Sequence, residues 1–413
     1  MVKKQEFVVG LDIGTTKICA MIGRRDGDGE AEIIGTGVTP SKGLRKGVVI
    51  NLESTIDSVE RAIEKAEEEA GVEVSRVFTG IAGGHIRGFN SRGVVGISRT
   101  SREVNRKDVE RVIEATKAVA IPLDQEVIHV IPQDFTVDDQ KGVKNPIGMS
   151  ANRLEAEVHI ITGAVTSAQN IIKSVNRAGF EVEDIVLGPL ASADAVLSPE
   201  EKRSGVVLID IGGGTTDMVI FSRGSIRHSE VLSLGGDHVT NDISVGLRTS
   251  PQQAEEVKKA YGYATASLIK REEFFHYPGV GGRRGGKVSL SQLCEVIEPR
   301  IEELFSLVSA DIDRTGLARS ISAGVVLTGG ASLLRGLPEM AERILRLPVR
   351  LGRPNGRVRG LGKGKDSPIY ATAVGLVHYG LAYRRQKKMA RFKGRNLFSQ
   401  VALRMREWLG EFF

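Results

Sequence analysis

The sequence contains little cysteine and no long apolar run. Of its 413 residues only Cys19 and Cys294 are cysteines. Two are too few for a disulfide framework, so we expect both to be buried apolar side chains in a reducing cytoplasm. No stretch of eighteen uncharged apolar residues occurs, and Asp12 interrupts the apolar run near the start. We therefore expect no signal peptide and no membrane-spanning helix.

The seven histidines also lack a functional pattern. They show neither the spacing of a metal site nor a partner for a catalytic nucleophile, so we predict structural roles for all of them. No residue can be assigned as a general base. Whether the chain hydrolyses a bound nucleotide therefore stays open, and we expect at most a weak ATPase.

Positive charge is concentrated at one end of the chain. The net charge is +6, and residues 384–413 alone hold nine lysines and arginines against two acidic residues. The remainder is therefore close to neutral. A basic stripe over a folded domain is typical of nucleic-acid binding, whereas a short basic tail beside apolar residues favours an anionic membrane surface. We expect no nucleic-acid partner.

The tail itself predicts a helix that lies in the membrane interface, at residues 396–413. At the helical period seven of its apolar residues share one face about 120° wide, and Leu403 lies outside that face. The seven are Leu397, Phe398, Val401, Met405, Trp408, Leu409 and Phe412. Residues 384–395 before them contain seven basic side chains and no acidic one, which we interpret as a linker held near anionic lipid. The alternative is a helix docked on the protein's own core.

Two segments that lie about half a chain apart resemble each other. Residues 8–16 read VVGLDIGTT and residues 207–216 read VLIDIGGGTT. Each is an apolar strand, an Asp-Ile-Gly turn and hydroxyl residues, followed by a second apolar strand. A duplicated hairpin indicates two similar α/β domains that face each other, with a cleft between the turns.

These turns suit a nucleoside triphosphate. Glycines let backbone N–H groups approach phosphate oxygens, threonine hydroxyls donate to them, and a strand-end aspartate holds the water shell of Mg²⁺. A third glycine turn, VVLTGGASL at residues 325–333, offers a surface free of side chains for adenine and the α-phosphate. One such turn alone is equally well structural, so the combination carries the prediction.

In their order along the chain the three motifs resemble the two phosphate segments and the adenosine segment of the superfamily of actin, sugar kinases and heat-shock chaperones. Within it the sequence most resembles the FtsA family of bacterial division proteins. The supporting strings are SKGLRKG at 41–47, LGGD at 234–237, AEEVK at 254–258, VIEPR at 296–300 and YATAVGL at 370–376. The resemblance implies an α/β, actin-like fold, with two facing α/β domains, a nucleotide cleft and a small inserted α+β subdomain.

The resemblance also implies domain boundaries. The first actin-like domain takes residues 1–83 and 163–195, and the inserted subdomain takes residues 84–162. The second domain takes residues 196–383, with a helical subdomain near 235–318. The basic linker at 384–395 and the amphipathic helix at 396–413 follow.

Roles at the site follow residue by residue from the same resemblance, with ATP and Mg²⁺ as cofactors. Asp12 and Asp210 would hold Mg²⁺ through water, and Gly329 with Gly330 would close the site. Glu255 and Lys258, spaced to share one helix face, would contact ribose and adenine, with a plain surface ion pair as the alternative. The β- and γ-phosphates would contact Asp12, Gly14, Thr15, Thr16, Lys17, Asp210, Gly212, Gly213, Gly214, Thr215 and Thr216.

The implied function is that of an ATP-binding cell division protein. It would polymerise at the cytoplasmic side of the inner membrane as a peripheral protein, anchor FtsZ filaments through the FtsZ C-terminal tail, and recruit other division proteins. Arg300 is the residue we expect to contact that acidic tail. The alternative for Arg300 is an internal salt bridge with Glu303.

Three other functions share this fold: a pilus-assembly actin-like ATPase, a sugar kinase or phosphatase, and a chaperone-like ATPase. A kinase needs an aspartate base beside a sugar pocket, and the sequence identifies none. A chaperone needs a substrate domain after the nucleotide fold, and only about thirty residues follow Tyr383. The pilus-assembly relatives share the fold and a location at the membrane, but they lack the terminal helix.

Overall fold

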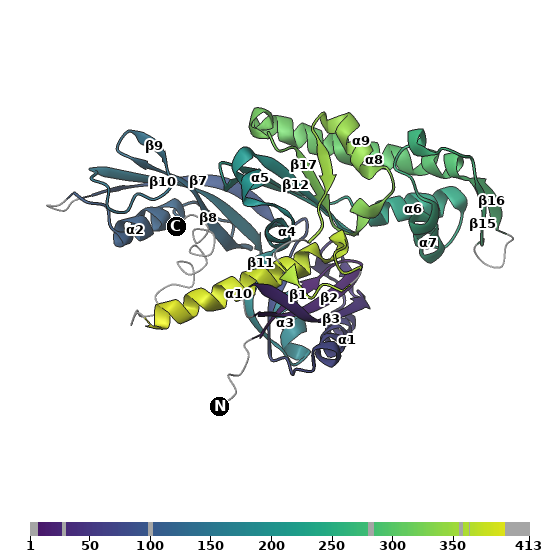
Figure 1. The fold of residues 1–413 in the computed structure, drawn as a ribbon, viewed down its shortest axis with the longest axis horizontal. Coiled ribbons are helices and arrows are strands. Elements are labelled where there is room, and N and C mark those ends of the chain that lie inside the picture. Colours follow the sequence, from purple (N-terminus) through teal and green to yellow (C-terminus); the bar gives the residue numbers. More distant parts are fainter. Residues whose placement is uncertain are drawn as a thin grey trace.

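Three main sheets organise the chain, two of them in facing domains and one in an insertion (Figure 1). The expected amphipathic helix at 396–413 lies outside the described residues. The computed structural model describes residues 7–26, 30–97, 102–279, 285–354, 358–362 and 364–392.

The first domain is a six-stranded sheet covered on both faces. Helices α1 (Leu52–Ala70) and α3 (Val165–Arg177) pack together on one side, while α10 (Ala371–Phe392) packs across β1 and β2 on the other, beside α4 (Gly188–Val196) (Figure 1). In order across the sheet the strands are β11 (Glu181–Leu187), β6 (Arg76–Ile81), β1 (Phe7–Ile13), β2 (Lys17–Arg25), β3 (Ala31–Pro40) and β19 (Val358–Arg359).

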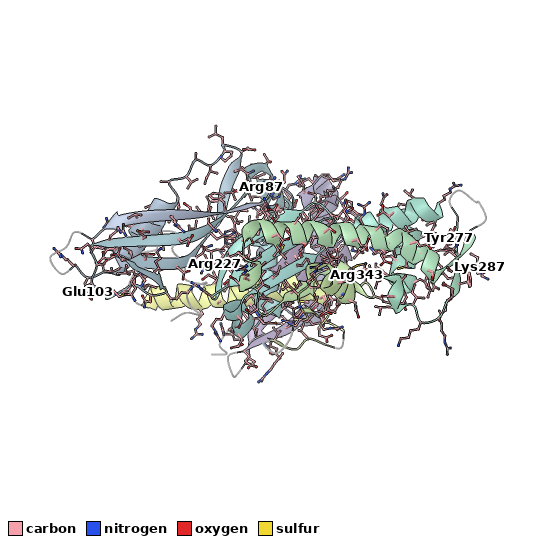
Figure 2. The ribbon with its side chains drawn as sticks, turned by 90° about the horizontal axis from the view of Figure 1, so that it is seen from above. Arg87, Glu103, Arg227, Tyr277, Lys287 and Arg343 are labelled. Atoms are coloured by element: carbon pink, nitrogen blue, oxygen red, sulfur yellow. The ribbon has the colours of Figure 1, made fainter. Side chains whose placement is uncertain are left out.

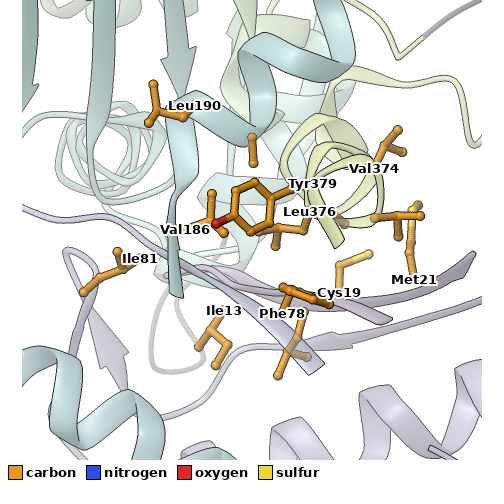
Figure 3. Close-up of a cluster of buried hydrophobic side chains, with 14 of the residues drawn as sticks. Ile13, Cys19, Met21, Phe78, Ile81, Val186, Leu190, Val374, Leu376 and Tyr379 are labelled. Carbon is orange, nitrogen blue, oxygen red and sulfur yellow. The ribbon is translucent and has the colours of Figure 1, made fainter. Parts of the chain in front are cut away.

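The core of this domain lies between the sheet and α10 (Figure 3). Phe78 from β6 is fully buried against the edges of the Tyr379 and Tyr383 rings, at centroid distances of 5.9 and 5.6 Å. Such edge-to-face contacts add to the stabilisation from apolar burial. The same core contains Cys19, which is fully buried, and Cys294 is buried in the second domain, so the prediction for both cysteines is confirmed.

The second domain repeats the hairpin at the centre of a five-stranded sheet. The second domain also contains a group of helices: α6 (Gly236–Leu247), α7 (Pro251–Tyr261), α8 (Leu290–Thr315) and α9 (Leu337–Leu345). Short helix α5 (Pro199–Ser204) leads into the sheet. In order the strands are β14 (Ser225–Leu232), β13 (Thr216–Ser222), β12 (Val206–Ile211), β17 (Val325–Thr328) and β18 (Val349–Leu351). Strand pair β15 (Phe274–Tyr277) and β16 (Gly286–Ser289) forms a separate hairpin.

The insertion is a four-stranded sheet with one helix, α2 (Arg106–Thr116), against it. The helix begins with a capping box formed by Asn105 and Asp108, which satisfies two backbone N–H groups at its start. Buried residues from the helix and the sheet make a third, separate core. In order the strands are β7 (Arg87–Gly96), β10 (Arg153–Ala164), β8 (Gln125–Val137) and β9 (Gln140–Val143).

The last helix continues into the segment expected to be a linker. Helix α10 runs to Phe392, so residues 384–392 are helical rather than extended. Arg384 is part of the folded domain, because its guanidinium pairs with Glu183 at 2.6 Å and donates to the carbonyl of Phe7 at 2.6 Å. Within the described residues, no helix is both long enough and apolar enough to cross a membrane.

Candidate nucleotide cleft

The turns of the two repeated hairpins lie on opposite sides of a cleft of about 860 Å³. This volume lies within the range of pockets that bury a small-molecule ligand. The cleft is lined by all but one of the residues expected to contact a nucleotide. They are Asp12, Gly14, Thr15, Thr16, Lys17, Asp210, Gly212, Gly213, Gly214, Thr215, Glu255, Lys258, Gly329 and Gly330.

Thr216 is the exception. Its side chain is fully buried, and its hydroxyl donates to the carbonyl of Leu234 at 2.8 Å. The bond ties the start of β13 to the turn at residues 234–237, whose four residues line the cleft. Thr216 therefore holds the cleft-lining turn in place without lining the cleft itself.

The two hairpins approach each other so closely that only glycine fits on one side. A Cβ atom on Gly213 would lie 1.9 Å from the Thr16 hydroxyl, and one on Gly214 would lie 2.8 Å from the Thr15 hydroxyl. Real Cβ atoms essentially never approach so near, so a side chain on Gly213 would displace Thr16, and one on Gly214 would displace Thr15 and the backbone of Lys46.

A short hairpin from the first domain completes this contact. Strands β4 (Leu44–Arg45) and β5 (Val48–Val49) pair, and the N–H of Gly47 between them donates to the Thr15 hydroxyl at 3.1 Å. The Cα of Lys46 would lie 2.8 Å from a Cβ on Gly214. The SKGLRKG string, which served above only as a family signature, thus contacts both phosphate hairpins.

Charged groups in the cleft come from both domains. Lys17 Nζ lies 2.7 Å from Asp12 Oδ2. Burial alone would lower the pKa of Lys17, but the carboxylates of Asp12 and Asp210 outweigh burial and raise it. Opposite them, Ser192 Oγ donates to Asp210 Oδ2 at 2.6 Å, and burial raises the pKa of Asp210 to about 6. The cleft therefore holds one ammonium group between two strand-end carboxylates.

Asp217 is a site residue that the sequence motifs did not reveal. It pairs directly opposite Asp210 across the β12–β13 hairpin and lines the cleft, although it is only 5% exposed. Thr215 Oγ1 donates to its Oδ2 at 3.2 Å, while its Oδ1 is buried with no hydrogen-bond partner. Burial, together with the Asp210 charge, raises the pKa of Asp217 to about 8. The sequence feature that could have identified Asp217 is its position opposite Asp210 in the predicted hairpin, which places both side chains on the same face.

Glu255 and Lys258 form the ion pair that was their alternative role, and they do so at the cleft. They line the cleft and also form an ion pair of 2.6 Å on α7. Lys258 Nζ donates to Thr240 Oγ1 at 2.7 Å and to the carbonyl of Gly236 at 3.0 Å. Although burial raises the pKa of Glu255, Lys258 outweighs it and holds that pKa below its usual value. The pair therefore joins α7 to the start of α6 at the edge of the cleft.

Arg300 makes the internal salt bridges that were its alternative role. From α8 its guanidinium pairs with Asp242 at 2.6 Å and with Glu303. It also lines the far end of the cleft beside Ile301. Its side chain is 28% exposed, so the guanidinium remains accessible from solvent.

One histidine belongs to a cluster that linear spacing did not reveal. Ligand atoms of His228, Glu230 and Asp311 lie within 4.8 Å of one another, which is close enough to hold a metal ion. Arg314 pairs with both carboxylates, and His228 Nε2 lies 2.7 Å from Asp311 Oδ2. Arg314 therefore offsets one of the two carboxylate charges of the cluster without a metal.

The buried carboxyl of Asp217 predicts a dependence of stability on pH. Its pKa is raised in the folded state, so its proton stabilises the fold below about pH 4, and this contribution is lost as the pH rises through about 8. Asp217→Asn should therefore have a higher free energy of unfolding than the parent at pH 8.5, by roughly 2 kcal/mol or more, and the gain should shrink toward pH 5.

Urea titrations at the two pH values measure this difference. Asp139→Asn is the matched control, because that carboxylate is fully exposed and its removal should leave the pH dependence of the parent unchanged. An Asp217→Asn variant less stable than the parent at pH 8.5 would contradict the assignment.

Comparison with solved structures bears out the actin-like fold. The chain superimposes on a structure described as a PilM–PilN type IV pilus biogenesis complex with a TM-score of 0.68 at 18% identity, covering 91% of this chain and 98% of that one. It superimposes on MreB5 of Spiroplasma citri bound to ADP with a TM-score of 0.58 at 16% identity, covering 93% and 98%. At these identities the similarity establishes the fold alone.

Sequence comparison identifies the family. A family model described as cell division protein FtsA matches residues 207–375, and one described as an SHS2 domain inserted in FtsA matches residues 83–162. The chain is 51% identical over 380 residues to the cell division protein FtsA of Pseudomonas aeruginosa, covering 92% of this chain and 90% of that protein. It is 41% identical over 383 residues to FtsA of Escherichia coli, covering 91% and 90%. The chain therefore belongs to the FtsA family of bacterial cell division proteins.

Proposed function

We propose that the chain binds ATP with Mg²⁺ in the cleft, polymerises at the cytoplasmic face of the inner membrane and anchors FtsZ filaments there. The observation that carries the proposal is the meeting of two Asp-Ile-Gly hairpins across one cleft, with the Gly329–Gly330 turn at its end. A structural neighbour with the same fold, MreB5, is bound to ADP. The division role follows from the family.

The carboxylates of the cleft fit a divalent cation. Asp12 and Asp210 come from the two opposite strand ends, and Asp217 adds a third carboxyl with an unpartnered oxygen. Lys17 is the neighbouring cation, and it pairs with Asp12. Hard oxygen ligands of this kind suit Mg²⁺, which keeps part of its water shell. Bound Mg²⁺ would neutralise charge on the β- and γ-phosphates, while the hairpin N–H groups and threonine hydroxyls orient them.

The glycine contact between the hairpins supplies the test of nucleotide binding. Gly213→Ala places a methyl group against the Thr16 hydroxyl, so Thr16 is displaced and the proposed phosphate contacts of the two turns cannot form together. Titration calorimetry with Mg-ATP should show at least a tenfold loss of affinity.

Gly80→Ala is the matched control. Gly80 also lines the cleft, but a Cβ there meets its nearest neighbours at an ordinary 3.6 Å. This variant should keep an affinity within about twofold of the parent. If the parent itself does not bind Mg-ATP, or if Gly213→Ala binds as tightly as the parent, nucleotide binding in the cleft is excluded.

The second domain supplies the proposed contact with FtsZ. Arg300 is a partly exposed guanidinium on the helical subdomain, and an acidic C-terminal tail offers it carboxylates in place of that of Glu303. A bidentate contact of this type is among the stronger charge-assisted hydrogen bonds.

Charge reversal tests this contact. Arg300→Glu should weaken binding of an FtsZ tail peptide at least tenfold in a fluorescence anisotropy titration. Arg343→Glu is the control, because Arg343 is a half-exposed arginine on α9 that pairs with Glu298 and Glu302 on α8. Equal binding by Arg300→Glu and the parent would remove Arg300 from the interface.

The membrane contact is proposed from the tail sequence. Half-burial of its seven apolar side chains would supply on the order of 5–10 kcal/mol before ordering costs. Each basic residue near an anionic surface would add up to about 1 kcal/mol. Attachment of one chain is then peripheral and reversible, and a polymer that presents many helices is held far more firmly.

Trp408→Glu places a charge at the centre of the apolar face. The variant should remain in solution when the parent floats with anionic liposomes, and its affinity for Mg-ATP should be unchanged. Ser399→Glu, outside the apolar face, is the control and should float with the vesicles. Flotation of Trp408→Glu to the same extent as the parent would exclude this anchor, and electron microscopy of the vesicles with ATP tests for filaments.

A further inference from the structure

The insertion, which interrupts the first domain in sequence, is fastened to the second domain by a buried polar interface. We call this interface the polar seam; Figure 2 shows one of its residues, Arg227, where the insertion meets the second domain. The contacts join the sheet of the insertion to β14, the edge strand of the second sheet. The seam consists of Asn90, Gln133, Asp134, Lys144 and His159 from the insertion, and Ser225, Ile226, Arg227 and Ser229 from β14.

Side chains of the insertion hydrogen-bond to the backbone of this edge strand. Gln133 Nε2 donates to the carbonyl of Ile226 at 2.7 Å, and Asn90 Nδ2 donates to the carbonyl of Arg227 at 3.1 Å. Gln133 is only 3% exposed, so an amide left without these partners would be costly. The insertion therefore covers the β14 edge as a further strand would.

A histidine connects the middle of the seam. His159 Nδ1 lies 2.7 Å from Asn90 Oδ1, which also accepts from Gln133 Nε2 at 2.8 Å. Because Asn90 Oδ1 is an acceptor, Nδ1 carries the proton and Nε2 accepts from the Ser229 hydroxyl at 2.8 Å. Burial lowers the pKa of His159 to about 3, so this ring stays neutral and its contacts do not change near neutral pH.

Charged residues close one end of the seam. Asp134 pairs with Arg227 and, at 2.9 Å, with Lys144, whose ammonium also donates to Ser225 Oγ at 3.1 Å. Both Arg227 and Asp134 side chains are about 15% exposed. Burial raises the pKa of Asp134, but Arg227 and Lys144 outweigh it and hold that pKa below its usual value. Removing Asp134 would leave two partly buried cations without their shared carboxylate.

The insertion is also joined firmly to the first domain. Strand β10 runs directly into α3, and His129 of β8 accepts from the N–H of Leu187 at 3.0 Å. Leu187 immediately precedes Gly188 and Pro189, which line the cleft. The two domains therefore cannot rotate apart by a large angle unless the insertion bends or the seam breaks.

The C-terminal end of β14 connects the strand to the cleft. The strand ends at Leu232, two residues before the turn at 234–237 that lines the cleft. His228 of β14 bonds to Asp311 of α8, and Leu304 of the same helix lines the cleft as well. Because the insertion holds β14, it also restrains the turn at 234–237 and helix α8, which both contribute residues to the cleft.

We propose that the polar seam limits the opening of the cleft and thereby sets the rate at which bound nucleotide leaves. This inference rests on the proposed binding of ATP. The seam residues are separate from those that line the cleft, so loss of the seam changes the frequency of opening while the cleft-lining residues stay in place. A protein partner that draws the insertion away from β14 would release nucleotide faster.

The test measures dissociation of a fluorescent ATP analogue from the full-length protein after a chase with excess ATP. Gln133→Ala removes three hydrogen bonds of the seam, those with Asn90, Ile226 and Arg227, and should speed dissociation roughly 5- to 10-fold. Ser229→Ala removes one and should speed it about 2- to 5-fold. Arg92→Ala is the control, because Arg92 lies exposed on β7 of the same insertion and pairs with Glu157 of the neighbouring strand.

Hydrogen exchange of the turn at 234–237 provides a second measurement, and it should be faster in both seam variants than in Arg92→Ala. A folded Gln133→Ala variant whose dissociation rate equals that of the parent would overturn the proposal. Should this variant fail to fold, an unchanged dissociation rate in Ser229→Ala would overturn it equally. If the parent itself binds no ATP analogue, the proposed function fails, and the exchange measurement alone decides whether the seam restrains the cleft.

Discussion

The structure depends on the close approach of two glycine-containing turns that carry carboxylates. Thr16 touches Gly213, and Thr15 touches Gly214, so the domains meet where strand-end aspartates come near one another. Burial raises the pKa values of Asp210 and Asp217, and repulsion from a neighbouring carboxylate adds to the rise in each case. Lys17 offsets part of the repulsion. This excess of carboxylates supports the proposed binding of a nucleotide together with a divalent cation.

The remaining contacts between the domains keep these turns in register. Helices α4 and α10 cross so tightly that a Cβ on Gly375 would lie 1.8 Å from the carbonyl of Ala191. Next to this crossing, Ser192 of α4 bonds to Asp210, and Thr372 of α10 lies 3.0 Å from the same hydroxyl. The crossing fixes the base of the cleft, and the polar seam restrains the domains at a second place. Two separated attachments define an orientation better than one.

Sequence alone predicted the parts that depend on local chemistry. The duplicated hairpins and the third glycine turn lie where expected. The phosphate-facing glycines were predictable because close backbone approach requires that residue type. Strands of the insertion were predictable from their apolar runs.

The parts that were missed depend on contacts between distant segments. Asp217 was not assigned because its function comes from burial opposite Asp210 rather than from its residue type. The seam residues Asn90, Gln133 and His159 are ordinary polar residues in the sequence, and only the packing of β7, β8 and β10 against β14 gives them partners. The basic residues from Arg384 onward were interpreted as a linker, and the helix that runs to Phe392 was not foreseen, because the sequence does not show that Glu183 lies beside Arg384.

Helix α10 connects the cleft to the basic segment of the chain. Its first turn places Thr372 in the cleft, beside the serine that bonds to Asp210, and its last described residues enter the basic segment. A helix of this length spans about 33 Å as a single rigid element. Arg384 fixes it to β1 and β11 through Phe7 and Glu183, so the helix cannot swing freely where it leaves the first domain. The described part of α10 therefore has a defined direction relative to the cleft. Chains attached to one surface through such tails would present their clefts and their insertions in a common orientation, which is the arrangement that a polymer needs.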